Sequence, residues 1–377
     1  MYGMCKIESR GIRRTLVKNF ITGIGGFVAS HLADYLLEQG EEVYGSYRWF
    51  EETDRIKHLI GNPKFYMIPM DLNDLSSCIK AIEDVKPDYI FHLAAQSYVT
   101  ESFDYPIATI ETNTIGTLKL LEAIKKVKDV SFSIKAVNWD PGQEIKKDFD
   151  SYSFDPVIHL CSSSEVYGLV KKEDIPIKET QPLNPANPYA VGKVGLDVLG
   201  QMYYNNYGMK IIRTRMFTHT GPRRTMMSAE CYYAKSIAEL EKQNITKKRN
   251  IDGSWESIYP KYVIKTGNMK SIRTWADVRD AVRAYYLLVR KCKPGEVYNI
   301  GGNTTKTIQE VLDYLLSISK LDRDKVLFET DPKLLRPYDV TLQIPDCSKF
   351  LNETGWKPEY TFEQTMQDLL DWWRTQV

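Results

Sequence analysis

The sequence lacks the signatures of several protein classes. Its six cysteines include no C-x-x-C pair, which argues against a zinc site and against a disulfide framework, so we expect reduced thiols and no metal. No apolar run reaches the roughly 18 residues of a membrane-spanning helix. Residues 1–14 carry charges where a secretion signal would have an apolar core. These absences favour a cytoplasmic protein without a membrane partner.

The chain also has almost no net charge. Fifty basic residues oppose 49 acidic ones, which leaves a formal charge of +1, so no overall field favours nucleic acid as a partner. With 377 residues, of which 43% are hydrophobic and 26% are charged, the composition is that of a globular protein. Two domains are expected for a chain of this length.

A glycine-rich turn follows the first apolar segment. Residues 16–22 form a short apolar run typical of a strand, and residues 30–39 show the apolar spacing of a helix. Between them, Gly23 and Gly26 begin the pattern G-x-x-G-x-x-A, in which backbone N–H groups can approach a pyrophosphate at a helix N-terminus. Phe27 lies in the same turn. The sequence therefore predicts a dinucleotide-binding turn.

Strands continue to alternate with helices after this turn. Such alternation is typical of an α/β protein with a parallel doubly wound (Rossmann) sheet, joined here to a smaller mixed α/β substrate domain. Strands are expected at residues 42–47, 65–70, 89–93, 156–161 and 210–216, and helices at 75–85, 106–126, 308–321, 347–354 and 360–374.

The residues that follow these strands indicate how a cofactor would bind. After the second strand, an acid would accept from a ribose 2′-hydroxyl, whereas Arg48 can pair with a 2′-phosphate, which favours NADP over NAD. Asp71 and Leu72 end the third strand, in a position suited to the adenine edge. Ala95 and its small neighbours would let the backbone pass close to the cofactor.

Two stretches break the alternation, and they mark the expected domain organisation. Residues 128–155 and 242–262 are polar and rich in turn-forming residues, so we interpret both as surface insertions of unknown role. The dinucleotide-binding domain is expected at residues 15–215 with a returning segment at about 265–302, and the substrate domain at 216–264 and 303–377.

A second group of residues suits the oxidation of a hydroxyl group. Tyr189 and Lys193 have the spacing Y-x-x-x-K, which places both side chains on one face of a helix. The ammonium group, together with the positive nicotinamide of a bound cofactor, would lower the pKa of the phenol, so that a phenolate could accept a hydroxyl proton. Ser163, at the end of an expected strand, is a natural hydrogen-bond partner for the same substrate oxygen.

Glu165 adds a base to this group. It stands two residues after Ser163, and on an extended segment both side chains would point to the same side. A carboxylate there could remove the proton next to a newly formed ketone and then assist the loss of hydroxide. The alternative is a surface glutamate that caps the next turn.

In combination, these motifs resemble the extended short-chain dehydrogenase/reductase family, in its nucleotide-sugar branch, and within it the GDP-mannose 4,6-dehydratases. The likeness is carried by TGIGGFVASHL, MDLND, HLAAQS, SSSEVYG, NPYAVGK, HTGPRR, NIGG and RPYDV. It implies that Ser163, Tyr189 and Lys193 form a catalytic triad and that Glu165 is the dehydratase base. It also places Leu93, Tyr189 and Lys193 along the cofactor.

The same resemblance supplies candidate substrate-binding residues. It implies that Lys235, Arg273 and Arg336 hold the nucleotide diphosphate, for which fixed cations are physically suited. Asp339 would bind a ribose hydroxyl. Thr218 stands where the family commonly has Asn near the sugar, which leaves open whether the substrate is a hexose or a heptose.

The resemblance implies an NADP-dependent lyase that forms a GDP-4-keto-6-deoxy sugar through C4 oxidation, C5 deprotonation, water loss and hydride return to C6. A GDP-4-keto-6-deoxymannose 4-reductase is the first alternative, because some reductases of this group also carry a nearby Glu. A UDP-glucuronate decarboxylase is weaker, because no arginine matches a substrate carboxylate. A non-catalytic nucleotide-binding protein would not need the Ser, Tyr, Lys and Glu. A homodimer or homotetramer is expected, the tetramer less securely because Trp49 replaces a cofactor-bridging Arg of the family.

Overall fold

The structure is a computed structural model of the 377-residue chain. It describes residues 16–134, 154–242, 246–249, 255–258, 262–335 and 340–377.

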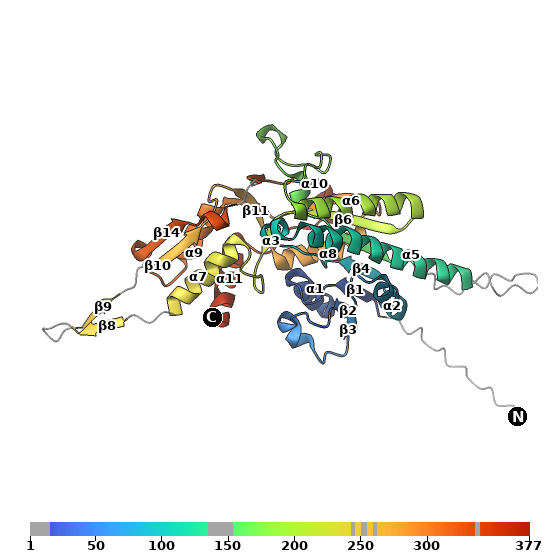
Figure 1. The fold of residues 1–377 in the computed structure, drawn as a ribbon, viewed down its shortest axis with the longest axis horizontal. Coiled ribbons are helices and arrows are strands. Elements are labelled where there is room, and N and C mark those ends of the chain that lie inside the picture. The colour runs from blue at the N-terminus through green and yellow to red at the C-terminus, as the bar shows by residue number, and fades with distance from the viewer. Residues whose placement is uncertain (1–15, 135–153, 243–245, 250–254, 259–261, 336–339) are drawn as a thin grey trace, which may run out of the picture.

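A seven-stranded parallel sheet forms the centre of the molecule (Figure 1). The strands have the order β12-β6-β5-β4-β1-β2-β3, and each neighbouring pair is parallel. The order changes direction between β1 and β4, and such a switch point is where doubly wound sheets bind ligands, at the carboxyl ends of the strands. The predicted α/β doubly wound fold is confirmed. The strands are β1 (Lys18–Thr22), β2 (Glu42–Tyr47), β3 (Phe65–Pro69), β4 (Tyr89–His92), β5 (Val157–Cys161), β6 (Lys210–Met216) and β12 (Val297–Ile300).

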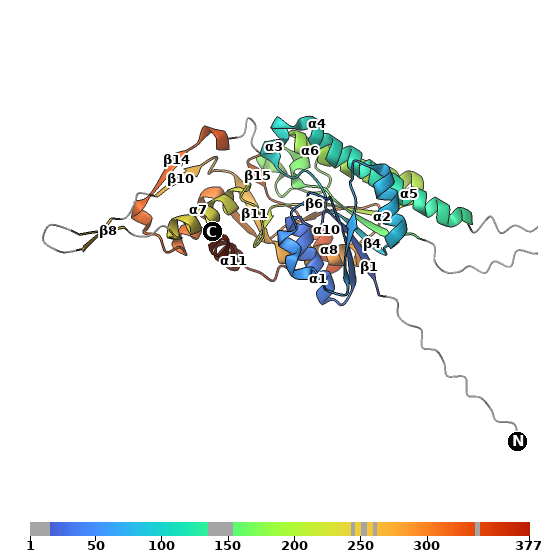
Figure 2. The same ribbon diagram turned by 60° about the horizontal axis from the view of Figure 1, so that its bottom comes forward.

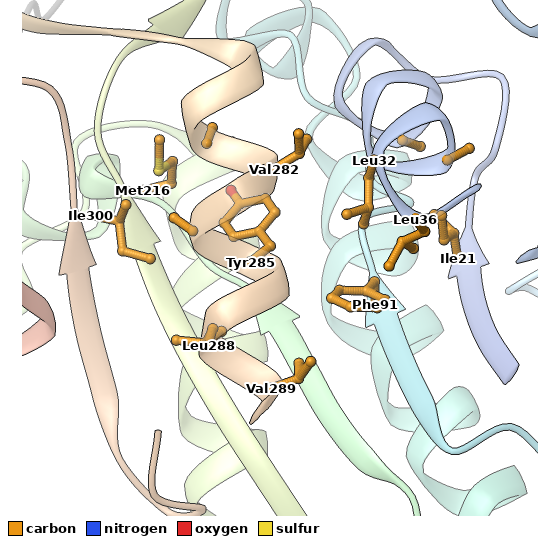
Figure 3. Close-up of a cluster of buried hydrophobic side chains, with 14 of the residues drawn as sticks. Ile21, Leu32, Leu36, Phe91, Met216, Val282, Tyr285, Leu288, Val289 and Ile300 are labelled. Atoms are coloured by element: carbon orange, nitrogen blue, oxygen red, sulfur yellow. The ribbon is translucent and has the colours of Figure 1, made fainter. Parts of the chain in front are cut away.

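Helices cover both faces of this sheet. On one face, α1 (Phe27–Glu38) packs beside α8 (Val278–Lys291), and their apolar side chains meet those of the strands in a buried cluster (Figure 3). Leu32 and Leu36 from α1 and Tyr285 from α8 belong to it. The other face is covered by α2 (Leu75–Val85), α5 (Gly116–Ile134) and α6 (Pro188–Tyr207), around a second buried cluster.

Local sequence signals explain the ends of α6, the helix that carries the Y-x-x-x-K motif. Asn187 caps its first turn, because its side-chain oxygen accepts a hydrogen bond from the backbone N–H of Ala190. Pro188 occupies the first helical position, where a missing N–H costs nothing. Gly208 ends the helix in the left-handed conformation with φ of 60°. The helix therefore begins immediately before Tyr189 and fixes the direction of its side chain.

A separate buried cluster lies to one side of the sheet (Figures 1 and 2). It is built from helices α7 (Ala229–Lys242), α9 (Ile308–Ser317) and α11 (Phe362–Gln376) and from strands β10 (Tyr262–Thr266), β11 (Ile272–Asp277) and β14 (Val326–Thr330). Strand β11 pairs with β13 (Thr304–Thr307), β15 (Leu342–Gln343) and β7 (His219–Thr220). The domain boundaries expected from the sequence stay a prediction.

The two expected insertions have different outcomes. Residues 135–153 lie outside the described part of the chain, and the preceding residues extend α5 to Ile134. The loop predicted for 242–262 is wrong in part, because β8 (Thr246–Arg249) and β9 (Trp255–Ile258) form an antiparallel pair. Lysines and other polar residues in these two segments hide the apolar alternation by which a strand is recognised in a sequence.

The remaining elements are short. Within the part of the chain that the structure describes, no helix has both the length and the apolar character to cross a bilayer. The predicted helix at 106–126 begins as α4 (Pro106–Ile110), passes through a π-helical turn, η2 (Glu111–Ile115), and continues as α5. The others are α3 (Val99–Asp104), α10 (Ser348–Thr354), and the 3-10 turns η1 (Asp54–Leu59), η3 (Ser164–Tyr167), η4 (Lys172–Asp174), η5 (Arg323–Lys325) and η6 (Pro332–Leu334).

Candidate active site

The glycine turn between β1 and α1 has the geometry of a pyrophosphate cradle. Gly23 has a φ of 70°, and a Cβ there would lie 3.0 Å from the Cβ of Ala94, so only glycine fits without strain. Gly26 is the N-cap of α1 and offers no side chain to cap the first N–H groups of the helix. These N–H groups are therefore available to an anion, and the helix dipole favours one there. The residues present fit the expected dinucleotide.

A buried hydrogen-bond chain supports this cradle from below. The Oγ1 of Thr22 accepts hydrogen bonds from the backbone N–H groups of Leu93 and Ala94, both at 3.0 Å. Because this oxygen already accepts two hydrogen bonds, the Thr22 hydroxyl donates its proton to Nδ1 of His92 at 2.9 Å. The other ring nitrogen of His92 then donates to Oγ1 of Thr117 at 2.9 Å. Burial lowers the pKa of His92 to about 3, which keeps the ring neutral, as this chain requires. Sequence reasoning missed His92 and Thr117, although the HLAAQS motif contains His92.

The predicted adenosine residues lie at the ends of their strands. Arg48 follows β2, is exposed, and lies with its guanidinium over the ring of Phe50, 5.0 Å from the centroid. The carboxylate of Asp71 accepts the backbone N–H of Asn73 at 2.9 Å. Leu72 is buried in the second cluster. Leu93 and Ala95 follow β4, each partly exposed. All five therefore border the carboxyl edge of the sheet, where the cofactor residues are expected.

Lys193 is buried beneath Tyr189 and is fixed by the end of β5. Its ammonium group donates to the backbone carbonyl of Cys161 at 2.7 Å and lies 5.9 Å from the centroid of the Tyr189 ring. Burial lowers the pKa of Lys193. The expectation that the Y-x-x-x-K spacing places both side chains on one helix face beside the strand end agrees with this arrangement.

The groups around Tyr189 shift its pKa in opposite directions. Burial raises its pKa, and the carboxylate of Glu165 adds to this rise, whereas hydrogen bonding to Ser163 and the charge of Arg224 lower it. In the protein alone the phenol is therefore protonated. The lower pKa expected from Lys193 together with a bound nicotinamide stays a prediction for the complex.

Ser163 and Glu165 come together, but by a turn and not by an extended strand. Ser163 is extended, and its Oγ accepts the backbone N–H of Glu165 at 3.2 Å, which starts the 3-10 turn η3. The expectation of an extended segment is therefore wrong, because a serine side chain after a strand competes for the next N–H groups. The Glu165 carboxylate accepts from Asn187 Nδ2 at 3.0 Å and from Gln343 Nε2 at 3.2 Å.

Tyr167 packs below this turn, away from the reacting groups. It is 1% exposed, donates to the side chain of Asn299 at 2.6 Å and accepts from Arg215 at 3.1 Å. The expectation that Tyr167 has a packing role agrees with these contacts.

The structure describes three of the five predicted substrate residues, which lie between β6 and β7, on β11 and on α7. The backbone carbonyl of Thr218 accepts from Ala276 of β11 at 3.0 Å. Arg273 is 9% exposed on β11, and its guanidinium donates to the carbonyl of Ile272 at 3.0 Å. Lys235 on α7 forms an ion pair with Glu239. Arg336 and Asp339 lie outside the described residues.

Sequence reasoning also missed Arg224. Its guanidinium lies 5.4 Å from the centroid of Phe27 and forms an ion pair with Glu230 at 3.1 Å. The ring of His219 stacks on the same Phe27 at 6.1 Å. Phe27 therefore packs the glycine turn against the segment that follows β6. Arg224 of that segment brings a positive charge near Tyr189. The HTGPRR motif contained both residues, but its chemistry was not assigned.

Comparison with known proteins fits this site. A family model described as GDP-mannose 4,6 dehydratase matches residues 20–369. A GDP-mannose 4,6-dehydratase from Yersinia enterocolitica is 30% identical, across 94% of this chain and 92% of the relative. A dTDP-glucose 4,6-dehydratase from Haemophilus influenzae is 28% identical, across 94% of this chain and 96% of the relative.

Solved structures agree in fold. The structure of RMD from Pseudomonas aeruginosa complexed with NADPH is similar with a TM-score of 0.70 and 25% identity, covering 96% of this chain and all of that one. Since the family model spans nearly the whole chain, the chain belongs to the GDP-mannose 4,6-dehydratase family.

Proposed function

We propose that this chain removes water from a GDP-linked mannose and forms a GDP-4-keto-6-deoxy sugar, with NADP as cofactor. It is an enzyme, a GDP-mannose 4,6-dehydratase-like lyase. One observation supports elimination in particular. Glu165, a base that simple oxidation or reduction of a hydroxyl does not need, is held close enough to Tyr189 to act on its pKa, with hydrogen-bond donors on both of its oxygens.

NADP, when bound, would supply the redox chemistry, a reversible hydride transfer. The chain contributes the binding groups. Gly23 and Gly26 would leave room for the pyrophosphate at the N-terminus of α1, and Arg48, which is exposed after β2, would pair with the 2′-phosphate. The NADPH held by RMD from Pseudomonas aeruginosa supports this assignment.

Tyr189 and Ser163 act at the C4 hydroxyl. Tyr189 removes the hydroxyl proton, and Ser163, whose side chain lowers the pKa of Tyr189, orients the substrate oxygen. Lys193 is held by the carbonyl of Cys161, so that its positive charge stays beneath the phenol when the proton arrives or leaves. Together they form the catalytic group for oxidation.

Glu165 acts at C5 and C6. A ketone at C4 makes the C5 proton acidic, and Glu165 takes this proton and passes it to the C6 hydroxyl, which leaves as water. C5 finally takes up a proton that balances the one removed from the C4 hydroxyl. One water is lost, and the cofactor ends in its starting oxidation state.

The nucleotide end of the substrate would be held by cations beside β11. We assign this role to Lys235 and Arg273, and keep the assignments of Arg336, Asp339 and Thr218 as proposals. Lys235 would exchange its ion pair with Glu239 for a phosphate, which is inexpensive because that pair is partly exposed.

We infer further that two copies of the chain associate through α6 and its neighbours. Val191 and Val198 on α6 are exposed, with 43% and 56% of their surface accessible, and Ile107 on the adjacent α4 is 73% exposed. Pairing of these apolar positions would form a helical interface.

The free state of the described cysteines agrees with a reducing, cytoplasmic location.

The proposed reaction can be tested directly. Purified protein is incubated with GDP-mannose and NADP, and the sugar nucleotide is analysed by mass spectrometry for the loss of one water. Loss of water without accumulation of NADPH is expected. If the protein instead leaves GDP-mannose unchanged and oxidises NADPH with a 4-keto sugar, the chain is a reductase and the proposal is wrong.

A further inference from the structure

Two buried amide side chains contact the Glu165 carboxylate, and a buried serine contacts one of these amides. Asn187, Gln343 and Ser164 are 6%, 3% and 4% exposed. Asn187 donates to one carboxylate oxygen at 3.0 Å and Gln343 to the other at 3.2 Å. Each oxygen therefore has an amide donor from a different part of the chain.

The orientation of each amide is fixed by a second hydrogen bond. Asn187 Oδ1 accepts the backbone N–H of Ala190, so Nδ2 must face Glu165. Gln343 Oε1 accepts from Oγ of Ser164 at 2.8 Å, so Nε2 must likewise face Glu165. Neither amide can turn over without placing its oxygen against the carboxylate and losing the second bond.

Gln343 also connects the base to the strand that carries a proposed diphosphate ligand. It lies on β15, opposite Arg273 of β11 in the strand register. The backbone N–H of Ile272 donates to the carbonyl of Thr341 at 2.8 Å, which fixes β15 against β11. The position of Gln343, and so of the carboxylate, depends on this pairing.

We infer that Gln343 is a positioning residue for the C5 deprotonation, oriented by Ser164 and working with Asn187 to hold the Glu165 carboxylate toward C5. It does not touch the substrate. Its amide restricts the carboxylate to the arrangement in which the base reaches the C5 proton, while the oxidation at C4, carried by Tyr189, does not depend on it. This inference rests on the proposed dehydratase function.

A single-turnover experiment separates the two steps. Enzyme with bound NADP is mixed with GDP-mannose, and the absorbance of the reduced nicotinamide is followed as it rises with C4 oxidation and decays after elimination. In Gln343→Met, which keeps the length of the side chain but has no donor, the rise should match the wild type. The decay should slow about tenfold to a hundredfold, the effect of losing a hydrogen bond to a charged group.

Isotope substitution identifies the slowed step. With substrate deuterated at C5, the decay in Gln343→Met should show a larger isotope effect than in the wild type, because deprotonation becomes more limiting. Ser164→Ala, which keeps Gln343 but frees its amide to turn, should change both measurements in the same direction by a smaller factor. Gln367→Met, which removes a partly exposed amide donor to Asp371 on α11, is the matched control and should behave as the wild type.

Three results would overturn the inference. An unchanged decay in Gln343→Met would show that its amide does not position the base. An equal slowing of the rise and the decay would indicate a general structural role. A slowed decay without a larger C5 isotope effect would place the effect on another step. Wild-type protein that forms no 4-keto-6-deoxy product would refute the proposed function itself, which is a separate outcome.

Discussion

Replacement of Asp197 by Asn should strongly destabilise the sheet-forming part of the chain. Asp197 lies on α6, is 1% exposed, and accepts from Arg213 at 3.0 Å and from Arg215 at 2.8 Å. Both arginines lie on β6 and are 6% exposed. One carboxylate thus neutralises two buried guanidinium groups.

The expected size of the effect follows from this geometry. In Asp197→Asn the side chain keeps its shape but loses its charge, and its NH2 group faces a guanidinium donor. Removing one partner from a buried ion pair costs about 3–5 kcal/mol. Arg213 still donates to the carbonyl of Gly295 and Arg215 to that of Glu179, so we expect a value near the lower end, about 3 kcal/mol.

Urea unfolding followed by circular dichroism measures this free energy. The control is Asp371→Asn, which removes an ion pair with Arg374 at a position where the carboxylate is 54% exposed, and which should cost less than about 1 kcal/mol. If Asp197→Asn were as stable as the control, the two arginines would not depend on Asp197, and the argument from burial would be refuted.

Three further predictions follow from the site and its surroundings. Glu165→Gln should keep C4 oxidation, because Tyr189 is still present, but should slow product formation about a hundredfold to ten-thousandfold, as loss of a general base does. Product formation is measured by mass spectrometry, and full activity would remove Glu165 from the mechanism. Arg48→Glu should weaken NADP binding about tenfold to a hundredfold, since a charge-assisted contact is lost, and should not weaken NAD binding. Fluorescence titration with both cofactors measures the difference. An equal change in affinity for both cofactors would contradict the role of Arg48 at the 2′-phosphate. Burial lowers the pKa of His92 and of His159 to about 3, below the unfolded value near 6.5, so the unfolded chain binds the extra protons first. Above pH 6.5 these groups should not affect the free energy of unfolding. Below pH 6.5 that free energy should fall by about 1.4 kcal/mol per histidine for each pH unit, until the pH approaches 3. Urea midpoints that do not change between pH 7 and pH 5 would contradict this.

The sequence by itself determined the fold class, because local patterns report local physics. Each buried parallel strand appears as a short apolar run, and the helix signals at Asn187, Pro188 and Gly208 act within a few residues of the helix ends. The glycine turn was equally readable, since Gly23 is needed for its own backbone angle and for the close approach of Ala94.

The candidate catalytic residues could also be predicted from sequence, because Ser163, Glu165, Tyr189 and Lys193 lie within about 30 positions of one another. A strand end and the following helix are brought together by the fold class alone. The one geometric error, an extended segment through Glu165, arose because a hydrogen bond to the Ser163 hydroxyl turns the backbone immediately after the strand.

Only the tertiary structure decided how the base is held and how the parts of the site depend on one another. Gln343 is 178 positions from Glu165 along the chain, and Thr22 is 70 positions from His92. No local pattern encodes such pairs, because hydrogen bonds between distant segments depend on strand order and register. The sequence therefore predicted which groups carry out the chemistry, and the tertiary structure determined which side chains hold those groups in place.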